Sequence, residues 1–106
     1  MRVISGPYVG HTFKHSKKFL RKLKKGSELK NAYVITLAPG KDLLEIYECS
    51  VLNQPYYRQR FERPVIGIAA DYDEAVQLVI TITQECLEQK GNCNLKEFLW
   101  EREAGK

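Results

Sequence analysis

Residues 64–91 read PVIGIAADYDEAVQLVITITQECLEQKG, and this stretch decides the fold. Residues 65–69 form a short unbroken apolar run, which is typical of a strand buried on both faces. Asp71 then offers a side-chain oxygen that can cap a helix, and Glu74 completes a capping box three residues later. Gly91 ends the pattern, because glycine tolerates the left-handed backbone that closes many helices. The stretch therefore predicts a buried strand followed by a long helix over residues 72–90.

Apolar residues recur through this predicted helix at steps of three and four. The central stripe consists of Ala75, Val79, Ile82 and Cys86. Three further residues widen that stripe: Val76, Ile80 and Leu87. We therefore expect the helix to bury a broad face.

Two alternating segments precede this unit. Residues 31–37 place Tyr33, Ile35 and Leu37 on one face, and residues 43–48 return with a matching apolar face. Residues 38–41 read APGK, in which proline and glycine suit the central positions of a type II turn. A β-hairpin over residues 31–49 is therefore predicted.

The connection over residues 50–63 is too long for a tight turn, and we expect it to hold a short helical turn interrupted at Pro55.

The two ends of the chain add smaller elements. Residues 2–10 mix apolar pairs with glycine and proline, so they form either a loop or a short edge strand. Within residues 12–25, Ser16 can cap a helix whose narrow apolar stripe is Phe19, Leu20 and Leu23. Near the other end, Asn94 and Glu97 repeat the capping pattern before a short terminal helix.

These elements predict a single α+β domain over residues 1–106, with a basic N-terminal segment (1–30) and a core (31–100). Its small three-stranded, mainly antiparallel sheet packs against one long helix, with a basic N-terminal helix and a short C-terminal helix. One face of the sheet carries the long helix, and the other carries the basic helix or a partner. A sheet of this kind has two edges, which makes β-mediated dimerisation a hypothesis to test.

Charge is distributed unevenly along the 106 residues. The net charge is +4, yet residues 1–30 hold nine basic residues and one acidic residue, a net of +8. Residues 31–106 hold eight basic and twelve acidic residues, a net of −4. The apolar content of 43% and charged content of 28% are typical of a soluble globular protein. No apolar run approaches the roughly 20 residues that a membrane span requires.

The three cysteines are Cys49, Cys86 and Cys93, and no two have the C-x-x-C spacing of a redox or zinc site. Cys49 and Cys86 fall on predicted buried positions, so we interpret them as small hydrophobic residues, whereas Cys93 is expected to be the most exposed. An odd number of cysteines without paired spacing indicates reduced thiols. Together with the lack of an apolar leader in residues 1–10, this predicts a cytoplasmic location.

Four short segments carry a resemblance: LEI at residues 44–46, PYY at 55–57, VIGIA at 65–69 and YDEA at 72–75. Over residues 43–100 the chain resembles a family of small bacterial proteins of uncharacterised function. The most distinctive part of the resemblance is the VIGIA-x-x-YDEA segment. The resemblance implies no activity, cofactor or catalytic residue, and it does not extend to the basic N-terminal helix.

Residue patterns that could carry catalysis have simpler explanations. His11 and His15 have the spacing of two metal ligands on a helix, but no acidic residue accompanies them and the lysines around them repel a cation. Asp71, Asp73 and Glu74 have the spacing that helix capping requires, and their charges would repel a phosphate. The chain also lacks a G-x-S-x-G nucleophile motif. We therefore predict no catalytic residue, no metal site and no cofactor.

The basic residues and nearby aromatic residues form the candidate surface for an anion, a nucleic acid or a protein partner. Cationic side chains can neutralise phosphates, and aromatic side chains can stack on bases. The candidate residues are Lys14, Lys17, Lys18, Arg21, Lys22, Lys24, Lys25, Tyr56, Tyr57, Arg58 and Arg60.

Three functions remain open. The first hypothesis is a non-enzymatic binding or assembly module that self-associates or binds a protein partner, in which the basic helix meets an acidic surface. The alternative is a nucleic-acid-binding protein that uses the basic helix, although no RNP motif or GXXG loop is present. The third is an enzyme, for which the sequence identifies no class.

Overall fold

The computed structural model describes residues 3–25, 32–38, 43–52 and 64–104. These residues form both strands and helices, and the fold is α+β, as predicted. The elements in chain order are β1 (Val3–Val9), α1 (Ser16–Lys25), β2 (Tyr33–Leu37), β3 (Leu44–Glu48), α2 (Cys49–Leu52), β4 (Val65–Ala69), α4 (Tyr72–Lys90) and α5 (Leu95–Ala104).

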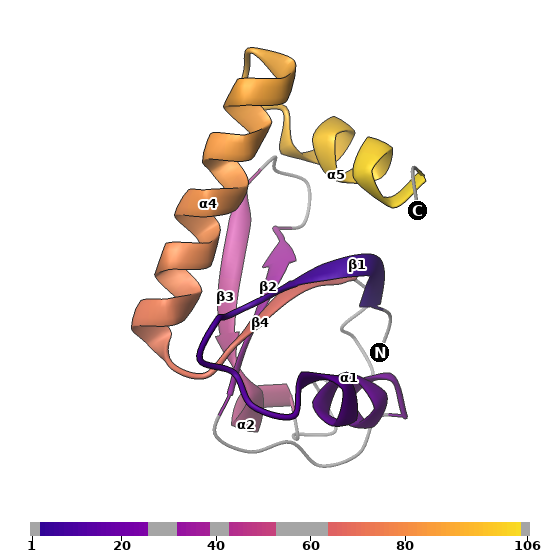
Figure 1. Cartoon of the computed structure of the whole chain (residues 1–106), viewed down its shortest axis with the longest axis vertical. Helices are drawn as coiled ribbons and strands as arrows, with labels where there is room; N and C mark the ends of the chain where they lie inside the picture. The colour runs from indigo at the N-terminus through magenta and orange to yellow at the C-terminus, as the bar shows by residue number, and fades with distance from the viewer. Residues whose placement is uncertain (1–2, 26–31, 39–42, 53–63, 105–106) are drawn as a thin grey trace.

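The strands form one sheet in the order β1-β4-β2-β3. Strands β2 and β3 are antiparallel, with Ile35 opposite Ile46 and Leu37 opposite Leu44, which confirms the predicted hairpin. Strand β4 runs antiparallel to β2 and parallel to β1. Figure 1 shows this sheet between helical layers, with α4 and α5 on one side and α1 on the other.

The prediction of a three-stranded, mainly antiparallel sheet is wrong in detail, because β1 adds a fourth strand and makes the sheet mixed. Of the two alternatives for residues 2–10, the edge strand is the one that forms. Gly6 has a φ of 65° and the pairing register with β4 shifts between Val3 and Tyr8. This irregularity interrupts the alternation that would have marked a strand in the sequence.

Strand β4 lies in the middle of the sheet and is buried along its whole length, as its apolar run predicts. A register shift opposite Ile35 and Thr36 leaves Ile66 as an extra residue in β4. The irregularity lets Val65 and Ile68 join the core on the α1 side while Ile66 joins the core on the α4 side.

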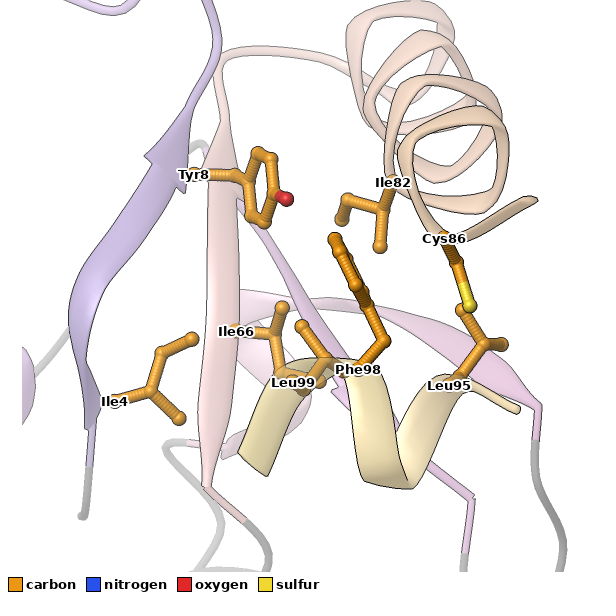
Figure 2. Close-up of a cluster of buried hydrophobic side chains, with 8 residues drawn as sticks. All are labelled: Ile4, Tyr8, Ile66, Ile82, Cys86, Leu95, Phe98 and Leu99. Carbon is orange, nitrogen blue, oxygen red and sulfur yellow. The ribbon is translucent and has the colours of Figure 1, made fainter. Parts of the chain in front are cut away.

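Two hydrophobic cores fill the two faces of the sheet. On one side, Leu23 of α1 packs with a set from the sheet, the residue before β2, and α2: Ala32, Val34, Cys49, Val65 and Ile68. On the other side, α4 and α5 cover a second set, seen in Figure 2: Ile4, Tyr8, Ile66, Ile82, Cys86, Leu95, Phe98 and Leu99. The N-terminal segment therefore contributes to both cores through β1 and α1.

Both predicted ends of α4 are confirmed. The Asp71 carboxylate accepts a hydrogen bond of 2.8 Å from the Glu74 N–H, and Gly91 adopts a φ of 72° after the last turn. The predicted width of its buried face is wrong, because Ile80 and Leu87 remain 43% and 44% exposed. These two side chains lie at the margin of the stripe, beyond the surface that α5 and the sheet cover.

Helix α5 confirms the predicted C-terminal helix and buries Leu95, Phe98 and Leu99. Lys90 at the end of α4 joins the two helices through ion pairs of 2.8 Å with both Glu97 and Glu101. No helix among the described residues has the length and apolar content needed to cross a membrane.

Candidate functional site

Helix α1 separates apolar from charged side chains along its length. Leu23 is buried, with Phe19 and Leu20 half-buried beside it, and this stripe fixes the direction of the remaining side chains. The charged residues of the helix are all basic and all exposed: Lys17, Lys18, Arg21, Lys22, Lys24 and Lys25. We call these six residues the basic face of α1. Three of them lie in the last turn, where positive charge suits the helix dipole.

The connection between β1 and α1 is a compact turn. The Phe13 N–H donates to the Gly10 carbonyl at 3.0 Å, and the Phe19 N–H donates to the His15 carbonyl at 3.0 Å. His15 has a φ of 57°, a left-handed conformation that histidine tolerates better than most residues with a Cβ. The helix begins at Ser16 itself, so His15 stands at the position that the sequence assigns to the Ser16 cap.

This turn and α1 line a cavity of about 480 Å³ that is open to solvent. Phe13 and Phe19 provide its aromatic lining, with their rings edge to face and their centroids 5.0 Å apart. Ala32 before β2 and Ala70 after β4 also line it, together with Thr12. The charged or titratable residues of the lining are all basic: Lys14, His15, Lys18 and Lys22. The cavity therefore combines aromatic surface with positive charge.

The side chain of Glu74, in the first turn of α4, connects two turns that line this cavity, and we call its contacts the Glu74 brace. Its carboxylate accepts hydrogen bonds from the Ala70 N–H at 2.8 Å, the Thr12 N–H at 3.0 Å and the Thr12 hydroxyl. Gly10 lies against the same carboxylate, since a Cβ placed there would overlap it. One buried side chain of α4 thus joins the β1–α1 turn to the β4–α4 turn, and two residues of the cavity lining depend on it.

The pKa of Glu74 reflects this bracing. Burial raises the pKa of a carboxyl, but here the hydrogen bonds from the Thr12 hydroxyl and from the Ala70 and Thr12 N–H groups outweigh burial. The charge of His11 acts in the same direction, and the pKa of Glu74 falls below its ordinary value. The side chain is therefore a fixed anion at neutral pH, engaged with backbone donors.

The three acidic residues at the start of α4 have different environments. Asp71 caps the helix, as predicted, while the Glu74 side chain reaches the Ala70 N–H rather than the Asp71 N–H of a standard capping box. Asp73 is exposed in the first turn. These contacts confirm that Asp71 caps the helix, whereas the predicted capping box does not form in its standard geometry, because the Glu74 carboxylate accepts from Ala70 and Thr12 instead.

The structure divides the predicted site residues into three groups. Lys14, Lys18 and Lys22 line the cavity. Other predicted residues are exposed on α1 without lining it: Lys17, Arg21, Lys24 and Lys25. The remaining predicted residues lie outside the described part of the chain: Tyr56, Tyr57, Arg58 and Arg60.

Sequence reasoning misses the aromatic part of the cavity. It assigns Phe19 only to the apolar stripe of α1, gives Phe13 no role, and considers His15 only as a metal ligand. The signal that could have found this group is the pair of phenylalanines on either side of the Lys14–Lys18 run.

A second polar cluster lies on the opposite side of the sheet. The Tyr8 hydroxyl donates to Glu85 at 3.1 Å, and the Arg102 guanidinium stacks 4.3 Å above the Tyr8 ring and donates to the Gly6 carbonyl at 3.2 Å. Burial raises the pKa of Tyr8 to about 12, with Arg102 opposing this shift and Glu85 reinforcing it. The phenol therefore stays protonated at neutral pH, and the cluster joins β1, α4 and α5.

The cysteines match their predicted environments, with Cys49 and Cys86 buried and Cys93 exposed. Burial raises the pKa of the Cys49 thiol to about 12, with Glu48 adding to the shift, so this thiol is a poor nucleophile at neutral pH. Among the described residues, no group of three or more histidine, cysteine or acidic side chains has the arrangement of a metal site.

Comparison of the chain with models of protein families, with curated proteins and with solved structures gives no significant match. The geometry of the cavity and the basic face is therefore the basis for a functional proposal.

Proposed function

We propose that the protein binds single-stranded nucleic acid through the basic face of α1 and the adjoining cavity. The observation that carries this proposal is the meeting of exposed cations with aromatic side chains in one place. Lys18 and Lys22 belong both to the basic face and to the cavity that Phe13 lines. Cations along a strand neutralise phosphates, and aromatic rings offer surface on which bases can pack.

A single strand fits this geometry better than a duplex does. In a duplex the bases are stacked and paired, so the half-buried rings of Phe13 and Phe19 could not reach their faces. An unpaired base can turn into the cavity while the neighbouring phosphates follow Lys17 and Arg21 on the outer surface of α1. We therefore expect a preference for single strands, with little dependence on base sequence.

Binding is tested by fluorescence anisotropy with labelled single-stranded and duplex oligonucleotides at about 50 and about 200 mM salt. We expect single strands to bind more tightly and to lose affinity steeply with salt. Changing Lys17 and Arg21 to Gln removes two charges while keeping good helix formers. The slope of log affinity against log salt should then fall by about 0.7 for each phosphate that the protein no longer neutralises.

Lys96→Gln provides a matched control, because Lys96 is an exposed lysine on α5, on the opposite side of the sheet. This variant should bind like the wild type. A lack of binding at low salt, or an equal loss of affinity in the Lys96 variant, contradicts the proposal.

Self-association is the second candidate, and the sequence ranks it first. The observation that favours it is that β1 and β3, among the described strands, each pair on one side only. Edge strands offer backbone groups to a second chain. Light scattering after size exclusion, in low and high salt, should then give a mass well above the 12.3 kDa of one chain. A mass near that of one chain at every concentration contradicts this candidate.

A further inference from the structure

The topology of the sheet gives the cavity a position that favours ligand binding. Strands β1 and β4 are adjacent and parallel, so their carboxyl ends meet at the same edge. The chain leaves β1 towards α1 on one face and leaves β4 towards α4 on the other, as Figure 1 shows. Neighbouring parallel strands whose connections separate in this way leave a crevice between them, and ligands of open sheets bind there.

The cavity lies at this point of separation. Thr12 and Phe13 belong to the connection that follows β1, and Ala70 belongs to the connection that follows β4. The location of the cavity follows from the strand order. It therefore supports ligand binding independently of the charge of the lining residues. Its volume of about 480 Å³ is within the range of small-molecule sites.

The charge of the lining selects the chemical class of the ligand. Lys14, Lys18 and Lys22 approach the cavity from the turn and from one side of α1. Two acids close in sequence to the lining residue Ala70 are engaged in other contacts, since Asp71 caps α4 and Glu74 accepts from Thr12 and Ala70. A terminal phosphate monoester carries about 1.5 to 2 negative charges at neutral pH, against one for a phosphate within a strand. Three lysines around one cavity suit the monoester.

The aromatic residues select for a planar group next to that phosphate. The rings of Phe13 and Phe19 hold each other edge to face with centroids 5.0 Å apart, so they present a fixed apolar corner. A nucleobase packs well on such a surface, whereas inorganic phosphate gains nothing from it.

We propose that the cavity binds a nucleotide bearing a terminal phosphate, with the phosphate at Lys14, Lys18 and Lys22 and the base against Phe13 and Phe19. The proposal rests on the proposed function when the nucleotide is the 5′-phosphorylated end of a strand. A free nucleoside monophosphate has the same chemistry, and the experiment separates the two sources.

The first arm maps small ligands by the amide chemical shifts of the isotope-labelled protein. Adenosine 5′-monophosphate should shift the amides of Thr12, Phe13 and Ala70, with weaker effects from adenosine and from inorganic phosphate. Lys14→Gln should weaken binding of the monophosphate about tenfold, the effect of removing one charge-assisted hydrogen bond. Phe13→Leu, which keeps an apolar side chain, should reduce the affinity for the monophosphate to near that for inorganic phosphate. Equal affinity of the wild type for inorganic phosphate and the monophosphate overturns the proposal.

The second arm compares one oligonucleotide with a 5′-phosphate and with a 5′-hydroxyl end. The phosphorylated strand should bind about tenfold more tightly, and Lys14→Gln should remove that difference. The control is Lys17→Gln, outside the cavity, which should weaken both strands equally. If both strands bind alike, Lys14→Gln affects neither preferentially and the monophosphate shifts none of the three amides, the cavity proposal fails while the proposed function stands. If the monophosphate binds but no strand does, the proposed function fails and the cavity proposal stands.

Discussion

The contacts of the Glu74 side chain predict how much unfolding free energy the protein loses when that side chain is removed. Glu74→Ala leaves the Ala70 and Thr12 N–H groups without their charged acceptor, which is 7% exposed in the folded protein. A hydrogen bond to a charged group contributes about 1.5–3 kcal/mol. Thr12 is exposed and water can replace part of its share, so we expect a loss of about 2–4 kcal/mol of unfolding free energy. A domain of this size has about 5–15 kcal/mol in total.

Gly10→Ala should cost a similar amount for the same reason. The new methyl group would overlap the Glu74 carboxylate, so the carboxylate must leave its three donors. In the double variant Gly10→Ala/Glu74→Ala that overlap no longer exists. The double variant should therefore be about as stable as Glu74→Ala alone, and the two losses should be far from additive.

Urea unfolding followed by circular dichroism measures all four proteins of this cycle. Additivity of the two losses to within about 0.5 kcal/mol would refute the brace. Glu74→Gln tests the charge separately. Because the pKa of Glu74 is lowered in the folded state, its contribution is present above the ordinary carboxyl pKa and is lost as the pH falls through the folded value. The difference between wild type and Glu74→Gln should be larger near about pH 7 than in acid below the ordinary carboxyl pKa, and a difference that is constant with pH would contradict the assignment.

Three further predictions concern the cores and the titrating groups. Leu23→Ala should cost about 2–5 kcal/mol in urea unfolding, because Leu23 is 1% exposed; a loss below about 1 kcal/mol would mean that α1 is not docked as described. Cys93 should react with a thiol reagent in the folded protein, while Cys49 and Cys86 should react only after denaturant is added, and rapid labelling of all three thiols would contradict their burial. The phenol of Tyr8, with its pKa raised from 10.0 to about 12, should ionise above the ordinary range of a tyrosine in a titration followed by ultraviolet absorbance. The stability it contributes should be lost as the pH rises towards that value, and Tyr8→Phe should remove this step.

Local chemistry explains which parts of the fold the sequence predicts well. The apolar run of β4, the Asp71 cap and the Gly91 end of α4 each depend on neighbouring residues, and all three are confirmed. The hairpin of β2 and β3 is predicted for the same reason, because its two segments lie close together in the sequence and have matching alternation.

Long-range pairing explains what the sequence does not reveal. Strand β1 pairs with β4 in parallel, and no local pattern announces a partner more than fifty residues away. Gly6 and the register shift further hide its alternation. The exposure of Ile80 and Leu87 likewise depends on where α5 packs, which the periodicity of α4 does not contain.

The candidate site likewise has a part that the local sequence predicts and a part that depends on long-range pairing. The basic residues of α1 are evident as a charge run, and Lys14, Lys18 and Lys22 are among the residues that the sequence predicts. The cavity itself is not predictable, because its lining combines α1 with the connections after β1 and β4 and with Ala32 before β2. Only the strand order brings these three connections to one edge.

The pairing of β1 with β4 also has a consequence for synthesis of the chain. Val3 pairs with Val65, so β1 has no partner in the sheet until about sixty more residues have been made. At about 5–20 residues per second, this wait lasts roughly 3 to 12 seconds. Throughout that time the segment of residues 12–25 lacks the contacts that it makes with β4 and with Glu74 in the folded protein. The same long separation applies when the complete chain refolds, because β1 must close a loop of about sixty residues before it pairs with β4. Pulsed hydrogen exchange during refolding should therefore find the amides of β1 protected later than those of the β2–β3 hairpin.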